Sequence, residues 1–434
     1  MEDAPVADAA PRTAATPRTD TGPPPLRHAW DALGTGAALV LEGAELVRVD
    51  LPMLAPVGTA LGTHRSRPLL LVHLRCRTPA SGRAVDGWGE CAALGDTTYD
   101  AEDVDDAWDT LGGILLPGLG GAARSLGGLL HSLGAVQRLA ELAPDRPLAF
   151  AALEAAVADA HLKAAGTSFA GLLGVSGAEV APGAVVGTTS SSGELVTAVA
   201  ARAAEGYVRV KVKIGPGADV DRIAAVAEWA TAAAAADDTV NVPHLQVDAN
   251  GAYGPGEIDR VAALEPYGLL CIEQPFARDD LASHRALARR ITTPVCLDES
   301  LDGPASVVGA VGSGACSVVC VKPARLGGIG NALDVVAWCA DAGVPWWVGG
   351  MFESGIGLRV TTALAALPGP SLPGDLAPPS TYLGVDLAPP ARSRPDPVSH
   401  VLSVGVHDGP GLAPAPDEAV LDALGARRAE VPLA

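Results

Sequence analysis

The stretch "YVRVKVKIG", residues 207–215, alternates apolar and charged side chains along its length. In a β-strand successive side chains point to opposite faces, so this segment would have one apolar face and one charged face. The apolar face consists of Val208, Val210, Val212 and Ile214, and the charged face of Arg209, Lys211 and Lys213. A solvated edge strand explains such a pattern as well as a functional site does. The rest of the chain decides between the two.

Composition places the chain among large globular α/β proteins and excludes several function classes. Its 434 residues are 48% hydrophobic, which is enough for a large core in one or two domains. A formal net charge of −20 argues against nucleic-acid partners and anionic membranes. The seven cysteines are scattered without a CxxC, which supports neither a disulfide framework nor a zinc site. We therefore predict a reducing, cytoplasmic location.

The first half of the chain predicts a leader followed by an α+β domain. Residues 1–40 begin "MEDAPVADAAPRTAATPRTDTGPPP" and contain no apolar signal segment, so we predict a disordered leader. Residues 41–95 show strand and hairpin patterns, and residues 103–173 are helical, ending in an alanine-rich run. Together they predict a compact domain over residues 41–175.

From residue 176 to 385 the pattern changes to apolar strands that alternate with alanine-rich helices. This alternation indicates parallel βαβ units, and their number favours closure into a barrel. The uncharged run 303–321 is long enough for a membrane span, but its Gly and Ser content favours a helix followed by a strand. The predicted strands lie at 207–214, 245–250, 271–276, 295–300, 318–324, 344–350 and 371–375.

Five charged residues stand near the C-terminal ends of consecutive predicted strands, separated by 35, 25, 25 and 24 residues: Lys213, Asp248, Glu273, Asp298 and Lys322. Each alone is equally typical of a helix cap or a solvated side chain. Together they would meet at one mouth of a barrel, which is where such barrels carry their active sites. Three adjacent carboxylates repel one another unless a hard cation holds them, so we predict Mg²⁺ or Mn²⁺. The charged face of residues 207–215 would then point into this mouth.

These motifs resemble those of the enolase superfamily, in its muconate-lactonizing subgroup and specifically the o-succinylbenzoate synthase and N-succinylamino acid racemase family. The resemblance covers roughly residues 43–415. It is carried by "GWGECAAL" (87–94), "KVKIGPG" (211–217), "LQVDANGAY" (245–253), "IEQPF" (272–276), "VCLDES" (295–300), "VKPARLGG" (321–328), "GGMFESGIG" (349–357) and "LPGD" (372–375).

The resemblance implies a modified (β/α)₇β TIM-like barrel with an α+β capping domain, to which a C-terminal segment, 386–434, returns. It implies Lys213 and Lys322 as acid/base residues, with Asp248, Glu273 and Asp298 as ligands of Mg²⁺. A lysine base must be neutral, and its reference pKa of about 10.4 is too high unless neighbouring positive charge lowers it. We expect Lys211 and the metal to supply that charge beside Lys213. The nearest candidate beside Lys322 is Arg325, although that pair could instead bind a substrate carboxylate. Substrate-binding positions are predicted at Lys211, Asn250, Arg325, Gly350, Met351, Glu353, Ser354 and Thr59.

The leading functional prediction is o-succinylbenzoate synthase, the dehydration of 2-succinyl-6-hydroxy-2,4-cyclohexadiene-1-carboxylate in menaquinone biosynthesis. N-succinylamino acid racemase stays open as an alternative, as does a non-catalytic protein that binds a carboxylate or a metal. A histidine-based racemase is disfavoured because no histidine lies between His284 and His400. A dipeptide epimerase is disfavoured because Asp375 is followed by Leu376 and Ala377 rather than by an Asp-x-Asp pattern. We expect a homo-oligomer that acts on a small anionic carboxylate.

Overall fold

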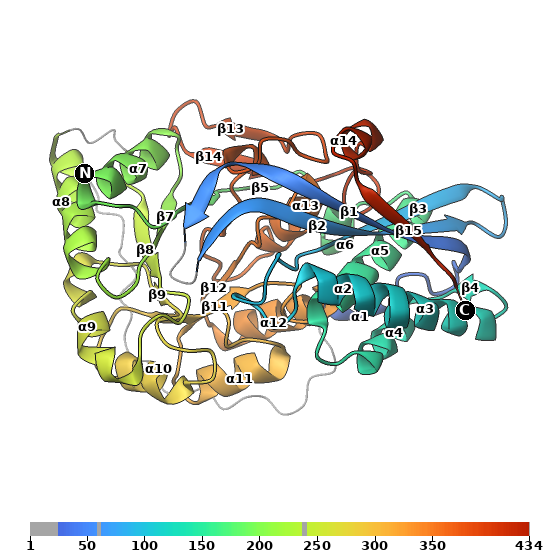
Figure 1. Cartoon of the computed structure of the whole chain (residues 1–434), viewed down its shortest axis with the longest axis horizontal. Coiled ribbons are helices and arrows are strands. Elements are labelled where there is room, and N and C mark those ends of the chain that lie inside the picture. The colour runs from blue at the N-terminus through green and yellow to red at the C-terminus, as the bar shows by residue number, and fades with distance from the viewer. Residues whose placement is uncertain (1–24, 59–61, 237–240, 434) are drawn as a thin grey trace.

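The chain folds into an antiparallel-sheet domain that lies beside a curled parallel sheet (Figure 1). This computed structural model describes residues 25–58, 62–236 and 241–433. The antiparallel domain occupies the right of Figure 1, and the parallel sheet with its surrounding helices the left. The predicted combination of a TIM-like barrel and an α+β capping domain is confirmed.

The parallel sheet supplies the barrel, and its strands follow one another in chain order. An isolated parallel bridge from Trp346 to Ser371 adds the predicted last segment at its edge. Val210 and Val212 face the helices and Lys211 faces the interior, and all three are buried because both faces of the strand are covered. The strands are β6 (Gly183–Val186), β7 (Arg209–Lys213), β8 (His244–Asp248), β9 (Ile272–Glu273), β10 (Val295–Leu297), β11 (Val318–Val321) and β12 (Trp346–Val348).

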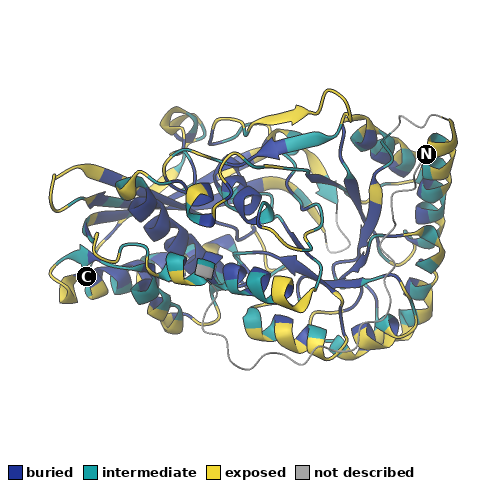
Figure 2. Ribbon diagram, turned by 180° about the vertical axis from the view of Figure 1, so that it is seen from behind, coloured by how far each residue is buried: buried dark blue, intermediate teal, exposed yellow. Residues whose placement is uncertain are grey.

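Helices cover the outside of the barrel, and their outer faces are exposed while the strands beneath them are buried (Figure 2). The helices are α7 (Ser192–Ala204), α8 (Val220–Ala236), α9 (Ile258–Ala262), α10 (Leu281–Ala288), α11 (Pro304–Gly312), α12 (Ile329–Ala342) and α13 (Gly355–Ala365). Three 3₁₀ turns accompany them: η3 (Pro255–Glu257), η4 (Glu265–Tyr267) and η5 (Pro379–Thr381).

The capping domain is a sheet in the order β15-β1-β2-β3, with β4 (Leu129–Leu130) beside β1. Its strands are β1 (Leu39–Gly58), β2 (Thr63–Arg77), β3 (Ala84–Cys91) and β15 (Arg427–Val431). Its helices are α2 (Val104–Thr110), the π-helix η1 (Leu111–Leu115), α3 (Leu116–Ser125), α4 (Leu133–Val136), the 3₁₀ helix η2 (Gln137–Leu142), α5 (Pro147–Ala165) and α6 (Phe169–Leu173). A Cβ at Gly89 would stand 2.0 Å from Ala152 O, so glycine in "GWGE" lets the alanine-rich α5 pack directly on β3.

Part of the predicted leader has regular structure. Residues within the expected leader form α1 (Pro25–Asp31), where Trp30 is fully buried and packs edge-on against Phe169. The prediction of a leader up to residue 40 is therefore wrong for residues 25–40, because one large aromatic side chain anchors the segment. Residues 1–24 lie outside the described part.

The C-terminal segment returns to the capping domain. Strand β15 pairs antiparallel with β1, and α14 (Glu418–Ala423) precedes it. Before them, β13 (Ser393–Pro395) and β14 (Leu402–Gly405) form a small sheet with β5 (Glu179–Val180). Within the described residues no helix has the length and apolar character needed to cross a membrane. All seven cysteines are buried and unpaired.

Two carboxylates of the capping domain accept hydrogen bonds from the N-termini of two barrel helices. Glu154 on α5 accepts the backbone N–H groups of Ile329 at 2.5 Å and Gly330 at 3.2 Å, at the start of α12. Glu90 on β3 accepts the N–H and hydroxyl of Ser354, at 3.0 and 2.6 Å, and the N–H of Gly357 at 3.0 Å, at the start of α13. Carboxylates suit helix N-termini, so these contacts fix the capping domain to the barrel.

Glu90 predicts a pH dependence of stability. Burial raises its pKa from 4.5 to about 7, although the hydrogen bonds from Ser354 oppose the shift. The folded state therefore binds the proton of the Glu90 carboxyl more tightly than the unfolded state does. The contribution of Glu90 to the free energy of unfolding is complete below about pH 4.5 and is lost as pH rises through about 7. Between these pH values the melting temperature of wild type should therefore fall more than that of Glu90→Gln. Melts of both proteins across this range, with exposed Glu141→Gln as control, measure the effect. Parallel curves for wild type and Glu90→Gln would contradict it.

Candidate active site

The five charged residues predicted from strand spacing converge at the C-terminal end of the parallel sheet. Lys213, Asp248 and Glu273 are the last residues of β7, β8 and β9, and Asp298 and Lys322 directly follow β10 and β11. The backbone there is unusual, because Asn250 and Gln274 have φ angles of +45° and +36°. Non-glycine residues with positive φ are costly and gather at functional sites.

Lys213 is held from two sides. Its Nζ donates to Asp248 Oδ2 at 2.6 Å and to Asn250 Oδ1 at 2.9 Å. Asn250 is oriented in turn, since its Nδ2 donates to Glu299 Oε1 at 3.0 Å and its backbone N–H to Asp248 Oδ1 at 2.9 Å. The amine of Lys213 therefore has a fixed position on one side of the site.

Lys211 lies deeper in the barrel and neutralises several carboxylates at once. Its Nζ is 2.7 Å from Asp375, 3.1 Å from Glu273 and 3.4 Å from Asp248, and it lies over the ring of Trp347. Burial by itself lowers the pKa of Lys211, but Asp375 and Glu273, followed by Asp248, raise it well above its usual range. Lys211 is therefore a permanent cation beneath the mouth.

The three carboxylates predicted as metal ligands are almost completely buried. Burial, and next the charge of Asp248, raise the pKa of Glu273 to about 8, against the opposing effect of Lys211. Burial also raises the pKa of Asp298, but Arg325 and Lys322 outweigh it and lower that pKa far below its usual range. Glu273 is thus the carboxylate of the cluster whose charged form is least favoured. The three carboxylates are oxygen donors of the kind that a hard divalent cation takes, and Glu273 and Asp298 belong to one group of possible ligand atoms within 4.8 Å, to which Asp248 does not belong.

Lys322 faces the site from the opposite side. Its Nζ donates to Asp298 Oδ2 at 2.8 Å and contacts the hydroxyl of Tyr99. Burial has the largest effect on the pKa of Lys322 and lowers it, but the charge of Asp298 raises it, and the pKa lies above its usual value despite Arg325. Arg325, the nearest candidate for lowering this pKa, does lower it. The opposite charge of Asp298 outweighs that effect.

A cavity of about 410 Å³ opens above these residues, between the capping domain and the barrel. Lys211, Lys213 and Lys322 all line it. The long strands β1 and β2 reach across from the capping domain toward the barrel (Figure 1), and their ends close the cavity on one side. The capping-domain lining consists of Leu54, Ala55, Pro56, Val57, Gly58, His64, Leu94 and Tyr99.

The other predicted substrate-binding residues divide into two groups. Gly350, Met351 and Glu353 line the cavity. Asn250, Arg325 and Ser354 are buried behind it and hold other side chains in place. Arg325 contacts Asp298 and donates to both oxygens of Asp100, at 3.2 and 3.0 Å, and Ser354 caps α13. Thr59 lies outside the described residues.

Sequence reasoning missed the capping-domain residues that reach the site. Tyr99, in "DTTYD", contacts Lys322 and donates to Asp298, and His64 at the start of β2 packs near Phe352 in the cavity wall. Phe352 has a φ of +57°, and its carbonyl accepts from the buried Arg67 at 3.2 Å. Tyr99 closely follows "GECAAL" (89–94), and its proximity to this motif was the available signal.

Lysine is rare in this chain and concentrated at this site. The sequence contains four lysines, and three of them, Lys211, Lys213 and Lys322, line the cavity. Arginine supplies nearly all other positive charge. An arginine stays protonated in proteins, whereas a lysine can lose its proton and act as a base. The residue type at these positions therefore favours proton transfer.

Comparison with known proteins agrees with this geometry. The family model "Enolase C-terminal domain-like" matches residues 194–420. An N-succinylamino acid racemase from an Amycolatopsis species is 40% identical over 385 residues, covering 88% of this chain and 96% of that protein. An o-succinylbenzoate synthase from Geobacillus stearothermophilus is 33% identical over 375 residues, covering 86% and 93%.

Solved structures give the same assignment. A member of the enolase superfamily from Listeria innocua aligns with a TM-score of 0.80 at 28% identity, covering 91% of this chain and all of that one. A probable mandelate racemase from Alicyclobacillus acidocaldarius aligns with a TM-score of 0.77 at 31% identity, covering 90% and 98%. The chain belongs to the enolase superfamily, in the family of the o-succinylbenzoate synthases and N-succinylamino acid racemases.

Proposed function

We propose that this protein is an o-succinylbenzoate synthase, which dehydrates 2-succinyl-6-hydroxy-2,4-cyclohexadiene-1-carboxylate in menaquinone biosynthesis. One observation carries the proposal: two lysines from strands on opposite sides of the mouth, Lys213 and Lys322, line one cavity above three buried carboxylates. Removal of a proton next to a carboxylate needs a base on one side and positive charge around the enediolate that forms. Several relatives carry the synthase name.

Lys213 has the role of the base in this proposal. Asp248 and Asn250 hold its Nζ in place, so that its lone pair can be presented to the α-carbon of a substrate in the cavity. The proton that Lys213 takes returns to the hydroxyl that departs on the same face. Lys322 stays protonated, supported by Asp298, and its charge stabilises the enolate from the opposite face.

Asp248, Glu273 and Asp298 would hold a divalent cation, with Mg²⁺ as the proposed ion. A divalent cation at such a site supplies positive charge to a developing enediolate. The cation would stabilise the charged form of Glu273 most, because burial and Asp248 disfavour that carboxylate. Lys211 compensates part of the same negative charge from below.

The synthase proposal predicts the effect of removing each lysine. Purified protein with Mg²⁺ and the cyclohexadiene substrate should form the aromatic product. Lys213→Ala should lower kcat by about 10²–10⁴-fold, the usual contribution of a general base, and Lys322→Ala should also lower it. Lys163→Ala is a matched control, because Lys163 pairs with Asp159 on α5 outside the cavity. Full turnover by Lys213→Ala, or no product from wild type at high enzyme concentration, would reject the proposal.

Metal removal gives a second prediction. EDTA should abolish turnover but leave the barrel folded, because its apolar layers hold the strands together. Added Mg²⁺ should then raise the unfolding free energy by about 2.7 kcal/mol at a hundredfold excess over the dissociation constant. Glu273→Gln keeps the shape and removes one negative charge, so it should show a smaller melting shift and a lower rate. Thermal melts with and without Mg²⁺, paired with turnover, decide it. An EDTA-treated enzyme that keeps its activity would refute the metal site.

N-succinylamino acid racemase is the second candidate. It is favoured by the racemase from Amycolatopsis at 40% identity, and by the placement of Lys213 and Lys322 on opposite sides, as exchange on both faces of a carbon requires. In D₂O, both enantiomers of an N-succinyl amino acid should then exchange their α-proton, measured by NMR. Because the two lysines face opposite sides of the α-carbon, Lys213→Ala should mainly stop exchange from one enantiomer and Lys322→Ala exchange from the other. No exchange from either enantiomer would reject racemisation and leave the synthase proposal standing.

A further inference from the structure

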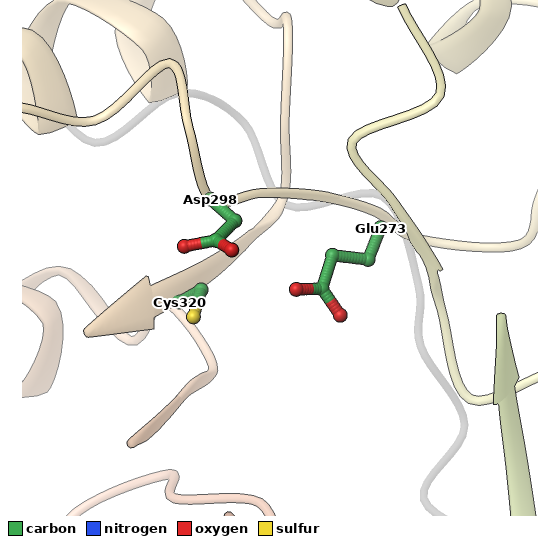
Figure 3. A group of neighbouring side chains, drawn as sticks. All are labelled: Glu273, Asp298 and Cys320. Carbon is green, nitrogen blue, oxygen red and sulfur yellow. The ribbon is translucent and has the colours of Figure 1, made fainter. Parts of the chain in front are cut away.

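The side chains of Glu273, Asp298 and Cys320 converge on one space inside the barrel (Figure 3). They come from three neighbouring strands, and one ligand atom from each lies within 4.8 Å of the other two. Asp248 is not a member of this closer group. A sulfur atom therefore stands near two of the oxygen ligands proposed for Mg²⁺.

The orientation of Cys320 is set by its strand and its neighbour. It precedes Lys322 by two residues on β11, so both side chains point into the barrel. A Cβ at Gly349 would lie 2.6 Å from Cys320 Sγ and 2.7 Å from Lys322 Cε, so glycine there leaves room for both. The strand and this close approach hold the thiol toward the carboxylates.

Cys320 is buried, with only 1% of its surface exposed. Its thiol nevertheless has no hydrogen-bond partner among the described residues. Another cysteine of the same interior layer differs, since Cys296 accepts a hydrogen bond from Trp347 Nε1 at 3.3 Å. An unpartnered polar atom at such a position is available to a ligand that enters from the carboxylate side.

Sulfur changes which cation the site favours. Oxygen ligands suit Mg²⁺, whereas a thiolate selects softer ions such as Zn²⁺ and Cd²⁺. In a tetrahedral site an ion about 2.0–2.2 Å from an oxygen and about 2.3 Å from a sulfur holds these two ligands about 3.6 Å apart. The ligand atoms in this protein lie within 4.8 Å of one another, so side-chain rotations would have to bring them to that separation.

We propose that Glu273, Asp298 and Cys320 form a second mode of metal binding, which takes a thiophilic divalent cation such as Zn²⁺ or Cd²⁺. The thiol releases its proton to solvent as the sulfur–metal bond forms. This mode shares two carboxylates with the Mg²⁺ site, so the two ions exclude one another. It leaves out Asp248, the carboxylate partner of Lys213, and a cation bound in this way inhibits rather than supports proton transfer.

The test is a titration of the full-length, metal-stripped protein with Cd²⁺, followed by the ultraviolet sulfur-to-cadmium charge-transfer absorption. Wild type should develop this band and saturate at one equivalent, and excess Mg²⁺ should reduce it. Cys320→Ser should lose the band and bind Cd²⁺ at least about 10-fold more weakly by calorimetry, with unchanged Mg²⁺ affinity. Cys296→Ser, a buried cysteine of the same layer, is the matched control and should keep the band.

Two results would overturn the proposal: Cd²⁺ binding to wild type without the band, or a band of full intensity in Cys320→Ser. If circular dichroism shows that Cys320→Ser does not fold, Asp298→Asn and Glu273→Gln replace it, because both keep the thiol. Each substitution should then weaken Cd²⁺ affinity, measured by titration of the band, by at least about 10-fold. Unchanged Cd²⁺ affinity in both variants would equally overturn it. These readouts do not depend on which reaction the enzyme catalyses.

Discussion

Burying an isolated charge costs several kcal/mol, and this protein withdraws three lysines and four carboxylates wholly or largely from water at one end of its barrel. The arrangement is tolerable because each charge has an opposite partner: Lys213 with Asp248, Lys322 with Asp298, and Lys211 with Asp375 and Glu273. Their side chains must point inward from neighbouring strands, so the register of the sheet and the positions of the charges depend on one another. Glu273 is the least compensated member, and the metal chemistry of the site therefore centres on it.

The capping domain is part of this charge balance as well as a cover. Tyr99 and Asp100 reach from it to Lys322 and Arg325, and the ends of β1 and β2 form one wall of the cavity. Neither domain contains the site by itself. The contacts of Glu90 and Glu154 with α13 and α12 hold the capping domain against the two helices that follow β12 and β11. The contact of Glu90 lies beside the cavity, because Ser354 directly follows Glu353, which lines it.

The sequence predicted the barrel strands and their terminal charges because both signals are local: side chains alternate along one strand, and polar residues stand at strand ends. Long-range contacts were not predictable in this way. Arg325 was expected to bind substrate or to lower the pKa of Lys322, but its guanidinium forms ion pairs with Asp100 and Asp298. Ser354 was expected in the cavity, but Glu90 takes its hydroxyl. Tyr99 has no pattern of its own, and only the folding of one domain onto the other brings it to the site.

The scarcity of lysine gives this protein an unusual spectroscopic property. A sample grown with lysine labelled by ¹⁵N at Nζ contains four such amines, and three of them surround the cavity. The fourth, Lys163, belongs to an ion pair on α5 and serves as an internal reference. Nitrogen chemical shifts recorded from the whole chain would then report almost entirely on the interior of the barrel mouth, where each amine has a different set of neighbours.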